Sequence, residues 1–216
     1  MTHFDGMARS YDAAYDARGA PGRALRDRLA TVLELAGDGP GDALDAGMGP
    51  GRLVVELERR GWHVSGVDAS PEMVALARKR VPGAAERLIV GTLEALPFPD
   101  ARFALVVATG VLEYARDLET ALAELARVVR PGGRAVVTLP NWWSASTLVR
   151  RLVLYPVARR LGRPAPPPPP RLIRPSELES LLRGAGLVPT ATRPTSFRPV
   201  RLPGFAAQVV LAAERP

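Results

Sequence analysis

Cysteine is absent from the 216 residues of this chain, and histidine occurs only twice, as His3 and His63. Without cysteine the chain can form neither a disulfide framework nor a thiolate metal site, and it offers no cysteine nucleophile. Lysine is nearly absent too, because Lys79 is the only one and every other basic side chain is an arginine. Mechanisms that need a thiolate are thereby excluded.

Long apolar runs are also missing. The longest, residues 104–112, is far shorter than the roughly 20 residues of a membrane-spanning helix. Residues 1–16 are polar and contain three aspartates, which does not fit the order of charged, apolar and small residues in a secretion signal. We therefore expect a cytoplasmic protein.

The net charge of +7 comes from arginines that are scattered along the chain, so nucleic acid is not an expected partner. Hydrophobic residues make up 47% of the chain and charged residues 24%, which is ordinary for a folded globular domain. The length suits one domain over residues 1–216. The sequence leaves the oligomeric state open.

Short apolar stretches alternate with amphipathic ones, a pattern typical of a parallel sheet covered by helices on both faces. The short connections predict an α/β, Rossmann-like, doubly wound sheet. Ser70 and Ser176 are expected to cap helices, and the last two strands are expected to form an antiparallel hairpin. The predicted strands are 43–46, 64–67, 88–90, 103–108, 135–139, 187–192 and 208–212, and the predicted helices are 23–35, 52–60, 71–80, 118–129 and 176–183.

A glycine loop follows the first predicted strand and contains Gly47, Gly49 and Gly51. Glycines at this place let the backbone turn sharply and approach a ligand. Asp68 ends the next strand about 20 residues later, where a carboxylate can accept both hydroxyls of a ribose. Asp45 directly before the loop would repel a pyrophosphate but attract an ammonium group. With the third glycine one residue earlier than in the dinucleotide fingerprint, these residues favour S-adenosylmethionine over NAD.

The chain resembles the class I S-adenosylmethionine-dependent methyltransferases, of the type 11 or ubiquinone-biosynthesis-like kind. Four blocks match in order, namely LDAGMGPG at 44–51, VSGVDASPEM at 64–73, ALPF at 95–98 with VLEY at 111–114, and LARVVRPGG at 125–133. The resemblance covers nearly the whole chain. It implies a seven-stranded, mostly parallel sheet whose last strand is antiparallel.

The resemblance also assigns cofactor contacts. It places the three loop glycines along the methionine part of S-adenosylmethionine and Asp68 on the ribose. Tyr11 resembles an N-terminal tyrosine that closes over the cofactor in many relatives, with an ordinary packing aromatic as the alternative. Thr109, just past the fourth strand, would lie near the sulfonium.

Around the adenine, the resemblance implies Ala69 and Met73 on its two sides. Thr92 stands where similar enzymes usually carry an aspartate for the adenine amino group. A threonine hydroxyl can still accept that hydrogen bond, but without charge. Adenine contacts are therefore expected to depend more on the backbone of Leu93.

Candidate catalytic residues follow the fourth strand, where we expect Glu113 as a general base and Tyr114 beside it. Methyl transfer depends mainly on alignment, so a catalytic side chain is not obligatory. Glu113 could instead be a structural carboxylate at the start of the next helix. Relatives that methylate quinone precursors often read EVLEH here, whereas this chain has Gly110 and Tyr114 at two of the three candidate ligand positions. No metal is therefore expected.

Residues 141–175 form a long connection that we expect to be functional. They open with two tryptophans and an apolar, arginine-flanked segment, and residues 164–170 are almost all proline. Three hypotheses remain: a lid over an apolar acceptor pocket, a peripheral membrane contact through residues 142–161, or a structural cover for the sheet edge.

The predicted function is transfer of a methyl group from S-adenosylmethionine to an oxygen or nitrogen of a small, partly apolar acceptor. The alternative is a non-catalytic regulatory module that only binds S-adenosylmethionine.

Overall fold

A seven-stranded sheet forms the centre of the computed structural model, which describes residues 8–16, 18–140, 155–160, 171–195 and 208–216. The strand order is β3-β2-β1-β4-β5-β7-β6, and β7 runs antiparallel to both of its neighbours. The other paired strands are parallel. The strands are β1 (Gly41–Ala46), β2 (Trp62–Asp68), β3 (Leu88–Val90), β4 (Phe103–Ala108), β5 (Val129–Pro140), β6 (Val188–Thr195) and β7 (Gln208–Glu214).

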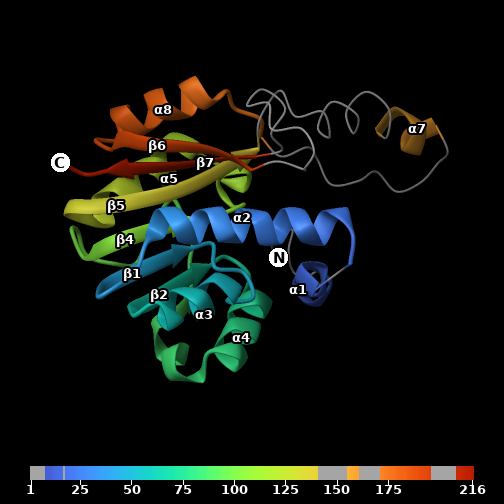
Figure 1. Ribbon diagram of the computed structural model, residues 1–216, viewed down its shortest axis with the longest axis horizontal. Coiled ribbons are helices and arrows are strands. Elements are labelled where there is room, and N and C mark those ends of the chain that lie inside the picture. The colour runs from blue at the N-terminus through green and yellow to red at the C-terminus, as the bar shows by residue number, and fades with distance from the viewer. Residues whose placement is uncertain (1–7, 17, 141–154, 161–170, 196–207) are drawn as a thin grey trace.

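Helices cover both faces of this sheet, as Figure 1 shows. On one face lie α2 (Ala20–Ala36), α3 (Arg52–Arg59) and α4 (Pro71–Arg80). On the other lie α5 (Leu118–Val128) and α8 (Pro175–Gly184). The short α1 (Ala8–Asp16) lies beside the N-terminal end of α2. Three further short helices are η1 (Pro82–Arg87), η2 (Leu112–Tyr114) and α7 (Tyr155–Arg160).

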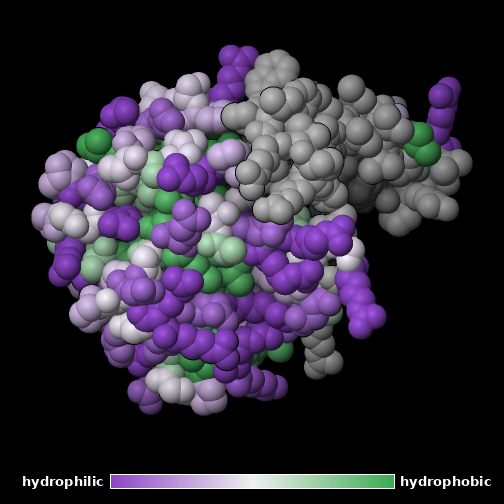
Figure 2. Space-filling model, in the orientation of Figure 1, coloured by the Kyte–Doolittle hydropathy of each residue, from purple (hydrophilic) through white to green (hydrophobic). Residues whose placement is uncertain are grey.

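Two apolar clusters fill the space between these layers. The cluster under α5 and α8 includes Phe103, Leu122 and Leu182, which are almost completely buried. The cluster under α2, α3 and α4 includes Val32 and Leu57. Figure 2 shows polar side chains over much of the outer surface of the visible face. The two layers hold the sheet rigid and leave the loops at its edges to form sites.

The order of the strands determines where a ligand can bind. β1 pairs with β2 on one side and with β4 on the other, so the chain direction across the sheet reverses at β1. In doubly wound sheets a crevice forms at such a reversal, beyond the carboxyl ends of the strands. The segments that follow β1, β2 and β4 meet there, and they carry most of the predicted site residues.

The predicted fold class is confirmed, including the antiparallel last strand and the hairpin of β6 and β7. The Ser70 cap is also confirmed, because its hydroxyl accepts a hydrogen bond from the Met73 N–H. The prediction that Ser176 caps a helix is wrong. α8 starts at Pro175, whose fixed φ suits the first helical position, and Ser176 lies inside the first turn.

Other parts of the structure differ from the predicted elements or fall outside the described residues. The sequence did not predict α1, and β5 and β6 are longer than expected. Most of the predicted lid at 141–175, and with it most of the membrane-contact segment at 142–161, lies outside the described residues. None of the described helices is long and apolar enough to span a bilayer.

Candidate functional site

The glycine loop that follows β1 has a backbone conformation that residues with a side chain rarely adopt. Gly47, Gly49 and Gly51 have φ values of 80°, 52° and 78°. A Cβ atom on Gly47 would lie 2.5 Å from a methyl group of Val111, which enters from the segment after β4. The Gly47 N–H donates to the Val67 carbonyl at 2.7 Å, which ties the loop to β2. The loop therefore presents bare backbone at the sheet edge.

Asp68, at the end of β2, fixes the loop and the start of the next helix together. Its Oδ2 accepts a hydrogen bond from the Gly49 N–H at 2.9 Å, and its Oδ1 accepts from the Ser70 N–H at 2.9 Å. The residue is partly exposed, so the carboxylate remains within reach of a ligand. Of the two residues predicted beside an adenine, Ala69 is exposed and Met73 is buried at the first turn of α4.

Asp45 lies under the loop as a buried acid. Its side chain is 1% exposed, and neither carboxyl oxygen has a hydrogen-bond partner among the described residues. Burial, and to a smaller extent the charge of Asp68, raises the pKa of Asp45 to about 8. A carboxylate in this position needs a cation to offset its loss of water. The loop and this acid therefore fit a ligand with an ammonium group.

The segment after β3 adjoins Asp68, because the Gly91 N–H donates to the Asp68 carbonyl at 3.0 Å. This contact brings the two residues predicted near an adenine to the same edge. Thr92 is exposed there, and Leu93 is buried against the core.

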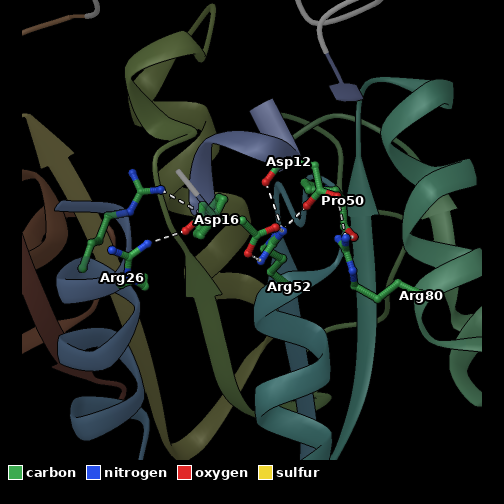
Figure 3. A network of polar contacts seen from close by, with 8 residues as sticks. Asp12, Asp16, Arg26, Pro50, Arg52 and Arg80 are labelled. Atoms are coloured by element: carbon green, nitrogen blue, oxygen red, sulfur yellow. Dashed lines mark hydrogen bonds and ion pairs between the residues drawn. The ribbon is translucent and has the colours of Figure 1, made fainter. Parts of the chain in front are cut away.

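The helix α1 is fastened to the loop by ion pairs, which Figure 3 shows. Asp12 accepts from Arg52 Nε and from Arg80 Nη2, both at 2.6 Å, and Asp16 pairs with Arg52 at 2.5 Å. Arg80 also donates to the Pro50 carbonyl within the loop. Burial alone would raise the pKa of Asp12, but hydrogen bonds from the two arginines hold it below its usual value. Asp12 thus keeps α1 beside the glycine loop.

Tyr11 on α1 lies next to the glycine loop. A Cβ atom on Gly49 would be 3.9 Å from the ring of Tyr11. The Tyr11 ring makes an edge contact with Tyr15, and both hydroxyls accept hydrogen bonds from Arg28 of α2, at 3.4 and 3.1 Å. Arg28 also donates to Gln208 Oε1 at 3.3 Å.

Arg28 was missed by the sequence analysis although the sequence contains a signal for it. Its position falls at helical spacing between Leu25 and Val32, within the apolar stripe of α2. A charged residue on that stripe either extends beyond the core to solvent or is buried, and a buried charge is rare unless it is paired. Burial would lower the pKa of Arg28, but the two tyrosines keep it above its usual value, so the side chain remains charged.

The segment after β4 holds the predicted catalytic residues. The Gly110 N–H donates to the buried Thr138 Oγ1 at 2.8 Å, which anchors the segment to β5, and Thr109 beside it is partly buried. Glu113 lies in η2, and its Oε2 is buried without a hydrogen-bond partner among the described residues. Burial raises the pKa of Glu113 to about 7. The neighbouring Tyr114 is 44% exposed.

Comparison with known proteins adds an independent finding. Residues 44–137 match the family model described as a methyltransferase domain. Malonyl-(acyl-carrier protein) O-methyltransferase of Serratia marcescens is 39% identical over 121 residues, which are 56% of this chain and 46% of that protein. Demethylmenaquinone methyltransferase of Thermus thermophilus is 41% identical over 124 residues, 55% of this chain and 54% of that protein. The chain spans about half the length of these curated relatives.

Solved structures agree over a larger part of the chain. A methyltransferase from Haloferax volcanii, solved with a methyltransferase activator, superposes with a TM-score of 0.74 at 18% identity, covering 100% of this chain and 99% of that one. Geranyl diphosphate C-methyltransferase from Streptomyces coelicolor, solved with S-adenosyl-L-homocysteine, gives a TM-score of 0.67 at 17% identity, covering 88% and 78%. At these identities the likeness concerns the fold. The domain match and the named relatives make this chain similar to methyltransferases, and the solved structures share its fold.

Proposed function

We propose that this chain transfers a methyl group from S-adenosylmethionine to an oxygen or nitrogen of a small, partly apolar acceptor. When bound, S-adenosylmethionine supplies a methyl group activated by a sulfonium. The observation that carries the proposal is the buried acid Asp45, which has no hydrogen-bond partner among the described residues, near the bare glycine loop and the partly exposed carboxylate of Asp68. An ammonium group and a ribose separated by a short chain satisfy both acids, and S-adenosylmethionine has that layout.

On the donor side, each residue has one role. Asp45 pairs with the ammonium group, the backbone of Gly47 and Gly49 borders the methionine part, and Gly51 allows the tight turn into α3. Asp68 accepts the ribose hydroxyls while keeping its bond to the loop. Tyr11 covers the loop from α1, where the ion pairs of Asp12 hold it.

The proposal extends to the remaining predicted cofactor residues. Ala69 and Met73 border the adenine from the start of α4, and Thr92 with the backbone of Leu93 borders it from the segment after β3. Thr109 lies on the side of the sulfonium. The positions of these residues around Asp68 and after β4 support these assignments.

On the acceptor side, Glu113 accepts the proton that the acceptor loses. A buried carboxyl with a pKa of about 7 is suited to this role, because it is substantially ionised at neutral pH and still basic enough to take a proton. Tyr114, which is exposed beside it, contacts the acceptor at the rim. The names of the relatives indicate two acceptor classes to test first, a malonyl thioester and a demethylated quinol.

The test is release of S-adenosylhomocysteine from S-adenosylmethionine in the presence of each acceptor class. Glu113→Gln should lower kcat about 100-fold or more, because general base catalysis contributes that much, and should leave the affinity for S-adenosylhomocysteine unchanged. Activity of the unaltered chain should rise with pH through about 7 and then level off, since the base must be ionised.

Glu119→Gln is the matched control, because Glu119 is an exposed acid at the start of α5. It should leave kcat and its pH profile unchanged. A Glu113→Gln variant with a kcat within about threefold of the original would remove Glu113 from the mechanism. Cofactor binding without turnover on any acceptor would instead favour the regulatory module.

A further inference from the structure

Arg28 is a buried positive charge to which the described part of the chain supplies no negative partner. Its side chain is 6% exposed, and its three side-chain hydrogen bonds go to Tyr11, Tyr15 and Gln208, which are neutral. Burial raises the pKa of Tyr15 to about 12, so its hydroxyl remains protonated at ordinary pH. Neutral partners recover only part of the cost of burying a charge.

Other arginines of the chain differ from Arg28 in this respect. Arg52, Arg80 and Arg127 are more exposed, yet each pairs with a carboxylate at 2.6 Å. The arginine that most needs a counter-ion is therefore one that lacks it within the described residues. Such a charge is suited to an anion that comes from outside the chain.

The segment after β4 is shaped to make room for this guanidinium. A Cβ atom on Gly110 would lie 2.6 Å from Arg28 Nη1, and the φ of Gly110 is 64°, which disfavours any other residue. The bond from the Gly110 N–H to Thr138 holds the segment in this position. Gly110, which departs from the pattern of quinone-methylating relatives, thus has a local explanation in Arg28.

The position of Arg28 lies between the two halves of the proposed site. Tyr11 connects it to the glycine loop, and Gly110 connects it to the segment that carries Glu113. Arg28 forms no ion pair with Glu113, and its charge lowers the pKa of that acid less than burial raises it. The guanidinium thus remains available to a ligand that reaches either half.

We propose that Arg28 binds a carboxylate of a ligand in this site. Its planar fork of N–H donors matches the two oxygens of a carboxylate. Two sources can supply that group, the α-carboxylate of S-adenosylmethionine and an acidic group on the acceptor. The inference rests on the proposed function, which brings both ligands to this edge of the sheet.

The first arm of the test compares S-adenosylmethionine with its decarboxylated form, which lacks only that carboxylate. Calorimetry on the full chain measures both affinities for the unaltered protein and for Arg28→Met. If Arg28 binds the cofactor, Arg28→Met lowers the affinity for S-adenosylmethionine about 10- to 100-fold, which is the range of a charged hydrogen-bonded pair. The affinity for the decarboxylated form stays unchanged.

The second arm uses malonate as a probe for an acidic acceptor, titrated into protein saturated with S-adenosylhomocysteine. If Arg28 binds the acceptor, Arg28→Met lowers the affinity for malonate by the same factor, while the affinity for S-adenosylmethionine stays unchanged. Gly110→Ala displaces the guanidinium without removing it, so it should reproduce the result of either arm. It also replaces Arg28→Met if that variant does not fold.

Arg23→Met is the matched control, because Arg23 is exposed on the same helix, and it should change nothing in either arm. Equal weakening of both cofactor forms with no effect on malonate would overturn the proposal, because it indicates a structural role. No effect in either arm would also overturn it. Failure of the unaltered chain to bind S-adenosylmethionine would instead contradict the proposed function, and the inference with it.

Discussion

Replacing Asp45 with asparagine should weaken the binding of S-adenosylhomocysteine about 10- to 100-fold. The same change should stabilise the ligand-free protein at alkaline pH. The loss of affinity follows from removing the charged partner of the ammonium group. The gain in stability follows from burial, since the ionised carboxylate has no hydrogen-bond partner among the described residues.

The pH dependence of this effect has a definite sign. The pKa of Asp45 is about 8 in the folded chain against 3.8 for an ordinary aspartate, so the folded state holds the proton over that range. Unfolding releases the proton, and stability therefore falls as pH rises from about 4 to about 8. The asparagine side chain cannot titrate, so the variant should lose less stability over this range, by several kcal/mol at about 1.4 kcal/mol per pKa unit.

Urea unfolding at about pH 5 and about pH 8.5 measures this difference. Glu113, whose pKa is also raised by burial, titrates in both proteins and cancels in the comparison. Asp42→Asn is the control, because Asp42 lies on the same strand and is partly exposed. An Asp45→Asn variant that binds S-adenosylhomocysteine as tightly as the original would contradict the role of Asp45.

Replacing Asp68 with alanine should abolish measurable binding both of S-adenosylhomocysteine and of methylthioadenosine, a loss of at least about 100-fold. Two ribose hydroxyls lose a charged acceptor, each worth about 1.5–3 kcal/mol. The glycine loop also loses its bond from the Gly49 N–H to Asp68 Oδ2. Calorimetry with the two ligands measures the effect.

Methylthioadenosine distinguishes the role of Asp45 from that of Asp68. Methylthioadenosine keeps the ribose and adenine but has neither the ammonium group nor the carboxylate, so Asp45→Asn should leave its affinity nearly unchanged while Asp68→Ala should not. Asp100→Ala, a change at an exposed acid that pairs with Arg127, is the control and should affect neither ligand. Equal sensitivity of methylthioadenosine to Asp45→Asn and to Asp68→Ala would contradict the assignment of the ammonium group to Asp45.

The central part of the fold could be predicted because its signals are local. The glycine loop, Asp68 and the Ser70 cap lie within one strand–helix–strand stretch, and mostly apolar stretches of three to six residues mark the parallel strands. The fold class is confirmed, and residues 44–137 match the model of a methyltransferase domain. Ser176 shows the limit of such signals, because a neighbouring proline moved the helix start.

The contacts of Arg28 could not be predicted because they join segments far apart in the chain. Arg28, Gly110 and Gln208 come from α2, the segment after β4 and the start of β7. From the sequence, Gly110 was only a departure from the pattern of relatives, and its reason became visible once Arg28 lay beside it. The helix α1 was missed for the same reason, since Asp12 is bonded to arginines on α3 and α4.

Calorimetric titration of the purified chain with S-adenosylhomocysteine tests the central claim most directly. We expect one binding site per chain with micromolar affinity that is lost on Asp68→Ala and weakened on Asp45→Asn. A flat titration of the unaltered, folded chain would contradict the account.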